Sequence, residues 1–456
     1  MPCLPVGDRV GDDLTTAMGK RLSSDASGWE RRYVVKTLWA LSLALVAVWL
    51  ASSLFPRTHS QEALLYFGAA HLEKADARAL KGRLASGINT LVVFLALHLI
   101  SKSGLVARWF RRPRPVTPKG ALLLGSLAGI AVACLLAAVS FPGTVYTGYL
   151  LERQYGLSNV AFQVWLIDYL KGLAANALVY VVAGGSVAWT LLRFPRNWAY
   201  ILTLGFVAAS ALVTFIYPWV IAPWSNRFYP LEDQVLLADV RQLSDKAGLK
   251  IDEVLVMEAS AKTSRVNAYF AGMGSSRQVV LYDTLLMTHS REQVGLVVAH
   301  EMGHWRHGHV SLGLWVTMVG TLIVLLVFRW SMPGLSQLRA TYAGLERVLL
   351  LLLVVSTLMG YVASPIANAI SRRFEVSADE YSLALTGDPE TFISTQVNLA
   401  KANLSDVEPP RFVRWIAWTH PTTMERISMA KGSIPRNCGC SVRLHQTRGR
   451  DSGGSL

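Results

Sequence analysis

Charged residues are scarce in this 456-residue chain: only 16% are Asp, Glu, Lys or Arg, whereas 52% are hydrophobic. A soluble protein normally has about a quarter charged residues, even when its length allows two or three domains. The sequence therefore excludes an ordinary soluble protein and predicts that much of the chain faces lipid.

Acidic residues are absent from seven long apolar runs. Crossing the apolar core of a bilayer takes about 20 mostly apolar residues in a helix, and buried helices of a soluble core would not need so many uncharged runs of this length. The sequence therefore predicts a predominantly α membrane protein with seven transmembrane helices. The runs are residues 37–55, 84–101, 120–145, 173–192, 198–224, 310–328 and 348–370.

Cysteines are also few, and their positions indicate no disulfide framework. Cys3, Cys438 and Cys440 lie in the terminal segments, and Cys134 lies in a predicted span. The first apolar run follows a segment of about 36 residues that contains both acids and bases, with no convincing cleavage site, so it is predicted to be a retained anchor.

Nucleic-acid-binding motifs do not accompany the net charge of +14. The basic residues flank the predicted spans instead, which favours anionic lipid headgroups over nucleic acid as partners. The loop 102–119 carries six Lys or Arg, but its flanking loops are basic too. Charge alone therefore does not select an orientation in the membrane.

Only two stretches are long enough to form a domain outside the membrane: the loop between spans five and six, and the segment after span seven. Seven spans place both on one side, so a site can be assembled from loop and tail together. The predicted parts are a polar segment (1–36), spans one to five (37–224), a catalytic loop domain (225–309), spans six and seven (310–370), a catalytic C-terminal segment (371–435) and a flexible tail (436–456).

The loop between spans five and six has the periodicity of a small α+β domain. Residues 231–247 have helical periodicity, and residues 253–257 alternate as a strand does. Two further strand-like runs, 267–271 and 278–282, are separated by the turn-forming residues Gly272, Gly274, Ser275 and Ser276. The sequence therefore predicts a small sheet that contains a hairpin.

A His-Glu-x-x-His motif follows this sheet. Ser290 and Gln293 form a capping-box pattern that starts a helix, and His300 and His304 then lie four positions apart on it. Both imidazoles can share a tetrahedral zinc ion, and Glu301 can take a proton from water and pass it to the leaving amine. The polar residues that follow, Trp305, Arg306, His307 and His309, are interpreted as anchors at the membrane surface.

A third protein ligand is required if the fourth position is to remain open for water. Glu375 is the candidate, because it directly follows the seventh span on the same membrane side as His300. Asp379 lies on the same helical face and can orient a ligating histidine. The alternative is a solvated helix with charged pairs four residues apart.

The sequence resembles the CAAX prenyl protease 1 family of multi-spanning zinc metalloproteases over most of its length. The motifs that carry the resemblance are, in order, Asn-Ala-Tyr-Phe at 267–270, Val-Ala-His-Glu-Met-Gly-His-Trp at 298–305 with Gly-His at 308–309, the segment 371–379, and His420-Pro421 with Glu425-Arg426.

The resemblance implies seven long helices around a chamber, closed at one end by a small α+β metalloprotease domain on the cytosolic side. It implies one zinc ion per chain held by His300, His304 and Glu375, and a strand edge at Asn267, Ala268 and Tyr269 that holds the substrate peptide. His420 becomes a donor to the oxyanion, and Arg426 binds a substrate carboxylate or braces the site.

The family cuts near a lipidated C-terminal cysteine, which implies a peptide or protein substrate that can be prenylated. It also implies a multi-pass protein of the cytoplasmic membrane or the endoplasmic reticulum. Two other functions stay open: a protease that degrades misfolded membrane proteins, and a zinc-stabilised scaffold or channel without turnover. Glu301 argues against the scaffold, because a structural zinc site needs no base.

Overall fold

The computed structural model describes residues 34–55, 57–103, 116–251, 253–272, 278–332, 335 and 341–434. Most of the predicted polar N-terminal segment, the flexible tail and the turn residues Gly274, Ser275 and Ser276 lie outside this range, as do Cys3, Cys438 and Cys440. Cys134 is described, and it is an exposed free thiol.

Seven helical segments of the described chain are long and apolar enough to cross a membrane, as predicted. Two are composite: the third is α5 (Pro118–Val145), the π-helix η1 (Tyr146–Leu150) and α6 (Leu151–Gln154), and the fifth is α8 (Trp198–Ile216), η2 (Tyr217–Ile221) and α9 (Ala222–Ser225). The others are Val34–Leu54, α3 (Ala69–Ser103), α7 (Phe162–Arg193), α13 (His309–Ser331) and the long α15 (Tyr342–Thr386).

Several helices extend beyond the apolar runs that predicted them, α3 and α15 the furthest. The run 84–101 is only the second half of α3, whose first half carries charged residues. The run 348–370 belongs to α15, which continues without a break to Thr386 and so includes Glu375 and Asp379. Charged residues end an apolar run without ending a helix, because Glu, Lys and Arg are good helix formers.

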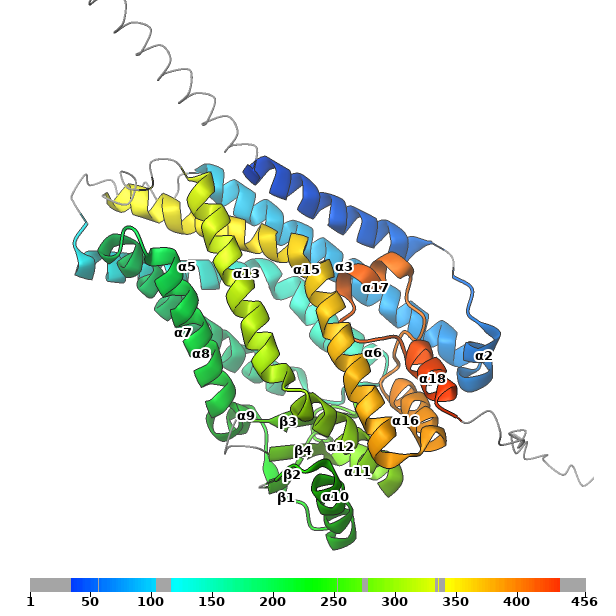
Figure 1. The fold of residues 1–456 in the computed structure, drawn as a ribbon. Coiled ribbons are helices and arrows are strands. Elements are labelled where there is room, and N and C mark those ends of the chain that lie inside the picture. The colour runs from blue at the N-terminus through cyan, green and yellow to red at the C-terminus, as the bar shows by residue number, and fades with distance from the viewer. Residues whose placement is uncertain are drawn as a thin grey trace, which may run out of the picture.

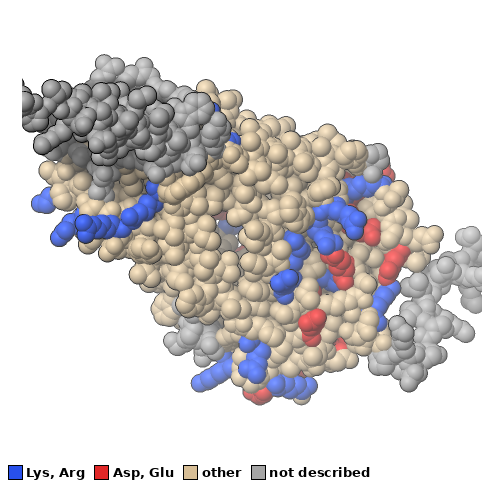
Figure 2. Space-filling view, turned by 45° about the horizontal axis from the view of Figure 1, so that its top comes forward, with Lys and Arg blue, Asp and Glu red and all other residues tan. Residues whose placement is uncertain are grey.

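The spanning helices are only partly packed against one another. Between 6% and 28% of the residues in the most apolar window of each span are buried, which is expected if the helices surround a chamber as well as facing lipid. On the face shown in Figure 2, uncharged side chains cover the middle of the molecule and charged ones gather toward its ends.

A four-stranded sheet lies at one end of the helices, in the order β1-β2-β4-β3 (Figure 1). β2 (Glu253–Met257) and β4 (Gln278–Tyr282) pair in parallel, and β3 (Ala268–Ala271) pairs antiparallel with β4, so the predicted hairpin is confirmed. β1 (Phe228–Pro230) was not predicted, because three residues that end in proline carry too little alternation. β3 is an edge strand of this sheet.

Helices cover this sheet and continue into the C-terminal segment. α10 (Gln234–Ala247), α11 (Asp283–Thr288) and α12 (Arg291–Arg306) share one apolar core with the strands, which includes Leu236, Val254, Leu281, Val298 and Met302. α16 (Pro389–Ala402) packs against α12 and α18 (Thr423–Gly432), and α17 (Arg411–Ala417) packs against α15. Loop and tail thus meet at one end of the bundle (Figure 1).

Candidate metal centre and active site

Helix α12 begins with the predicted capping box. The Ser290 hydroxyl accepts a hydrogen bond from the Gln293 N–H (3.4 Å), and the Gln293 side-chain oxygen accepts one from the Ser290 N–H (3.2 Å). The helix buries Val294, Val298 and Met302 against the sheet. His300 and His304 are only partly buried, so their side chains remain available on another face of the helix.

Gly303 brings α12 against α15. A Cβ atom at this position would lie 2.8 Å from the Ala378 Cα, closer than real Cβ atoms come, and 3.0 Å from the Ala378 carbonyl oxygen, which is a tight contact. A glycine within the His-Glu-x-x-His motif is therefore required for the two helices to pack backbone to backbone. This close packing carries Glu375, one turn before Ala378, toward the two histidines.

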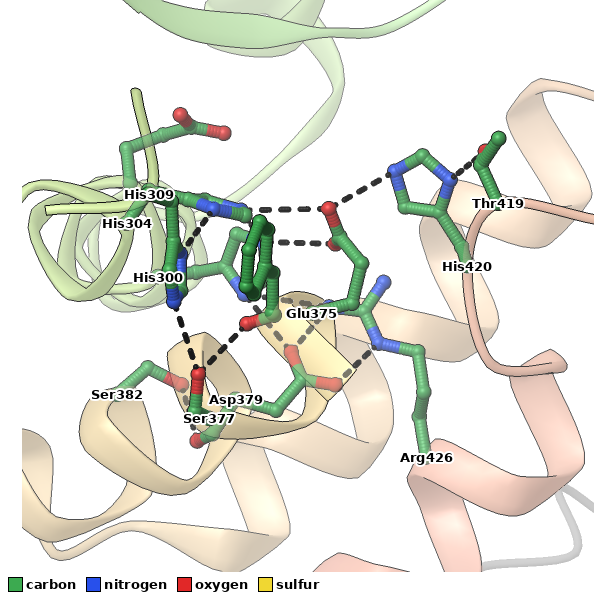
Figure 3. A network of polar contacts seen from close by, with 12 residues as sticks. His300, His304, His309, Glu375, Ser377, Asp379, Ser382, Thr419, His420 and Arg426 are labelled. Carbon is green, nitrogen blue, oxygen red and sulfur yellow. Dashed lines mark hydrogen bonds and ion pairs between the residues drawn. The ribbon is translucent and has the colours of Figure 1, made fainter. Parts of the chain in front are cut away.

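Three side chains converge at this helix crossing (Figure 3). The Nε2 atoms of His300 and His304 lie 3.2 Å apart, and each lies 3.4 Å from a carboxylate oxygen of Glu375. Ligands in a tetrahedral zinc site, bound at about 2.0 to 2.1 Å, lie roughly 3.3 Å from one another. The spacing of the three side chains matches that geometry without rearrangement.

The hydrogen bonds of His300 assign its tautomer. Its Nδ1 lies 2.8 Å from the Asp379 carboxylate, which can only accept a hydrogen bond, so Nδ1 carries the proton. Asp379 is fully buried, and the Arg426 guanidinium binds both of its oxygens. In the neutral ring, the His300 Nε2 therefore presents a lone pair toward His304 and Glu375, as a metal ligand does.

His304 is oriented by a chain of hydrogen bonds through His309. Ser377 donates its hydroxyl to the Phe374 carbonyl (2.9 Å), so its oxygen accepts from the His309 Nε2–H (3.1 Å). The His309 Nδ1 is then a lone pair that accepts from the His304 Nδ1–H (2.9 Å). The second histidine of the motif thus also points a lone pair at the centre.

His309 is therefore not the membrane-surface anchor that the sequence suggested. It is 8% exposed and stacks on Phe374 with ring centroids 4.4 Å apart. Gly308 brings it there by adopting a left-handed conformation (φ 64°) between α12 and α13. By contrast, Arg306 and His307 are exposed. The signal that could have identified His309 was the Gly-His pair at a helix end, where glycine allows the chain to turn back.

The centre has the donor set of a metal site. Two imidazole lone pairs and a carboxylate face one another, all of them acceptors, and the buried Glu375 Oε2 has no hydrogen-bond partner among the described residues. Three acceptors at this spacing repel one another unless a cation lies between them. Two nitrogens and one carboxylate are a typical ligand set of catalytic zinc, so these residues fit the metal.

Glu301 lies beside the two histidines and reaches the sheet. Its Oε2 accepts a hydrogen bond from the Phe270 N–H of β3 (3.4 Å). Burial raises the pKa of Glu301 above its usual range, although His300 and His304 oppose the change. A carboxylate whose pKa is moved toward neutrality is suited to accept and return a proton.

The free edge of β3 passes this carboxylate. The Tyr282 N–H of β4 donates to the Asn267 carbonyl (3.1 Å), and hydrogen bonding alternates along an antiparallel pair. The backbone groups of Ala268 and Phe270 therefore point away from β4, and the Phe270 N–H meets Glu301. Asn267 is exposed, whereas Ala268 is buried and Tyr269 is partly buried.

The C-terminal segment supplies two further side chains. The His420 Nε2 lies 3.4 Å from Glu375 Oε1, and its Nδ1 lies 2.8 Å from the Thr419 hydroxyl, which places the ring opposite α12 (Figure 3). The His420 side chain is 58% exposed, and desolvation on the side that faces Glu375 lowers the pKa of His420 and favours the neutral ring. Arg426 pairs with Asp379, which in turn accepts from His300, so of its two predicted roles the bracing role has contacts in the structure.

A bundle of seven apolar helices and a small α+β unit that carries a His-Glu-x-x-His helix define an integral-membrane metalloprotease. Comparison with known families agrees: residues 230–434 match "Peptidase family M48", and residues 66–227 match "CAAX prenyl protease N-terminal, five membrane helices". The chain belongs to peptidase family M48, in its CAAX prenyl protease branch. It is thus a metalloendopeptidase that acts on peptide or protein substrates with a metal cofactor.

Individual relatives cover most of the chain. The metalloprotease YhfN of Bacillus subtilis is 28% identical over 347 residues, which are 74% of this chain and 80% of YhfN. CAAX prenyl protease 1 of Saccharomyces cerevisiae is 26% identical over 320 residues, 65% of this chain and 70% of the yeast protein. The crystal structure of S. mikatae Ste24p shares the fold, with a TM-score of 0.68 at 21% identity, over 86% of this chain and 98% of Ste24p.

Proposed function

We propose that the enzyme is a zinc endopeptidase in which His300, His304 and Glu375 hold one zinc ion and Glu301 is the general base. The observation that carries this proposal is the convergence of two histidine lone pairs and a carboxylate within 4.8 Å of one another, with a second carboxylate beside them. A purely structural metal site has no use for that second carboxylate.

A zinc ion in this place would polarise the scissile carbonyl and lower the pKa of water. Glu301 takes the proton of the attacking water and returns it to the leaving amine. His420 donates its Nε2–H to the carbonyl oxygen as negative charge develops there, from the side opposite α12. Asp379, held by Arg426, keeps the first histidine in the ligating tautomer.

The substrate peptide binds in extended form along β3. The Ala268 N–H and the Ala268 and Phe270 carbonyls, which point away from β4, can pair with an added strand, and Asn267 and Tyr269 flank it. Pairing on this edge would lay the peptide backbone beside Glu301, because Glu301 already contacts the Phe270 N–H. The register of the strand then selects which peptide bond reaches the metal.

The natural substrate in this proposal is a peptide with a prenylated cysteine near its C-terminus, cut on the cytosolic side of the membrane. The names of the yeast and rice relatives, CAAX prenyl protease 1 and its homolog, support this substrate class. The location of the centre also supports this substrate class. Glu375 lies on the spanning helix α15, so a lipid chain can stay among apolar helices while the peptide is bound at the centre.

The test is cleavage by purified protein reconstituted in lipid, with metal content measured on the same sample. Three substrates are compared: a fluorogenic prenylated peptide, its unprenylated twin and an unfolded membrane protein. We expect one zinc per chain and a clear preference for the prenylated peptide. Cleavage by zinc-free protein would contradict the role of the metal. Equal cleavage of all three substrates would contradict the substrate class and would favour a quality-control protease.

A further inference from the structure

A cavity of about 460 Å³ adjoins the candidate active site and shares two residues with it, His420 and Arg426. Its volume is within the range of pockets that hold small ligands. The remaining walls come from the first span, α3, α6, the segment before β3, and the segments around α16, α17 and the start of α18. Because His420 contacts Glu375, a group bound in this cavity lies next to the candidate metal centre.

Positive charge dominates the lining of this cavity. Among its described lining residues are one carboxylate, Asp406, and four arginines: Arg78, Arg83, Arg265 and Arg426. We call it the arginine pocket. Arg78 and Arg265 share the single carboxylate of Glu152, at 2.6 and 2.7 Å, so one negative charge balances two guanidinium groups.

The carboxylate that lines the pocket is shared in the same way. Asp406 accepts from Arg83 at 2.5 Å and from Arg57 at 2.9 Å, and Arg57 also lies 3.4 Å from Asp76 outside the pocket. Arg83 is 6% exposed and belongs to α3, one of the spanning helices. A buried arginine in such a helix is costly to keep, and it usually faces a water-filled cavity or a functional partner.

Several hydrogen-bond donors of the pocket lack acceptors. Among the described residues, the Nε and Nη2 atoms of Arg83, the Nε of Arg78 and the Nε1 of Trp49 are buried without a partner. All four are donors, and all belong to residues that line the pocket. A buried donor without a partner destabilises the fold, and a ligand that only accepts hydrogen bonds would satisfy all four.

We propose that the arginine pocket binds the C-terminal carboxylate of the substrate peptide, with Arg83 as the principal contact. The proposal rests on the proposed function of the adjoining site. A carboxylate accepts hydrogen bonds at both oxygens and matches the fork of a guanidinium group. A pocket at a fixed separation from the centre makes the enzyme prefer peptide bonds at one short distance from the chain end.

The test compares peptides of one sequence that end in a free acid or in an amide, cleaved by zinc-loaded enzyme in phosphatidylcholine nanodiscs. We expect kcat/KM to favour the acid by about 10- to 100-fold, mainly through KM, because a site built around a polar contact rejects a substrate that lacks it. Peptides with one to five residues after the scissile bond should show this preference most strongly at one length. Equal values for acid and amide at every length would overturn the proposal.

The matched variants are Arg83→Lys and Arg57→Lys, because both arginines contact Asp406 and only Arg83 lines the pocket. Lysine keeps the charge beside Asp406 but loses the planar fork. We expect Arg83→Lys to lose most of the acid preference with little change for the amide, and Arg57→Lys to keep it. An Arg83→Lys enzyme that keeps the parental preference would refute the role of Arg83.

Binding separates this proposal from the proposed function. In zinc-loaded Glu301→Gln protein, the acid peptide should bind about 10- to 100-fold more tightly than the amide. If the parental enzyme cleaves no peptide and the Glu301→Gln protein still binds the acid better than the amide, the proposed function fails and the pocket proposal stands. If cleavage occurs without any acid preference, the pocket proposal fails alone. If phosphatidylglycerol nanodiscs are required for turnover of both peptides and Arg83→Lys removes that requirement, the pocket holds a lipid headgroup and the proposal is wrong.

Discussion

Replacing His309 by phenylalanine removes the acceptor of the His304 Nδ1–H while keeping an aromatic ring against Phe374. Without that acceptor, His304 has no partner that fixes its tautomer, and its Nε2 carries a proton for part of the time. A metal ion must then displace this proton and reorient the ring. We therefore expect His309→Phe to weaken zinc binding without removing a ligand.

The size of the effect follows from the contacts. Loss of a group that orients a ligating histidine typically costs about 10-fold to 100-fold in metal affinity, or about 1.4 to 2.8 kcal/mol. His309 is a neutral acceptor at 2.9 Å, whereas the acceptor of the other ligating histidine, Asp379, is a buried carboxylate. The loss for His309→Phe should therefore lie near the lower end, about 10-fold, and it should be smaller than for Asp379→Ala.

The assay is a zinc titration of metal-free protein in detergent against a chromophoric chelator. His307→Phe is the matched control, because His307 stacks on His309 with ring centroids 5.6 Å apart but is exposed. Ser377→Ala should have an intermediate effect, since it removes the acceptor of the His309 Nε2–H. Parental affinity in His309→Phe, or an equal loss in His307→Phe, would show that the hydrogen-bond chain does not set the ligating tautomer.

Three further predictions concern the chemistry of the site. Glu301→Gln should keep zinc and lose about 100-fold to 10,000-fold or more of turnover, measured as metal content and peptide cleavage on one sample, and near-parental turnover would remove Glu301 from the mechanism. Glu375→Ala should lose zinc and activity together, whereas Asp379→Ala should lose about 10-fold to 100-fold in zinc affinity; unchanged affinity in Glu375→Ala would place the third ligand elsewhere. His420→Ala should lower kcat by about 100-fold to 1,000-fold with zinc retained, whereas Asn267→Ala should mainly raise KM; steady-state kinetics that show a parental kcat in His420→Ala would identify that residue as a bystander.

The parts of the site that the sequence predicts are those set by local geometry. His300 and His304 share a helix face because of their spacing, and β3 could be recognised from its alternation and the glycines beside it. Glu375 was predicted from its position directly after a span, and the continuous helix α15 carries it to the two histidines. Each of these inferences depends on a period of a few residues.

The parts that the sequence does not predict depend on contacts between distant segments. His309 is one of several polar residues at a helix end, and only the turn at Gly308 distinguishes it from its neighbours. The ion pair between Arg83 and Asp406 joins residues 323 positions apart, so no local pattern contains it. For the same reason the extension of α3 beyond the apolar run was missed, since its charged first half is stabilised by partners elsewhere in the chain.

The crossing of α12 and α15 has a consequence for how the enzyme is made. His304 and Glu375 are separated in the sequence by the whole of α13 and most of the span of α15, so both helices must be inserted in the bilayer before the two side chains can meet. Arg426, which fixes Asp379, is synthesised later still. A nascent chain that has inserted only its first five spans can fold the loop domain but lacks Glu375 and Arg426. Proteolysis is therefore expected only after the seventh span and the C-terminal segment are in place.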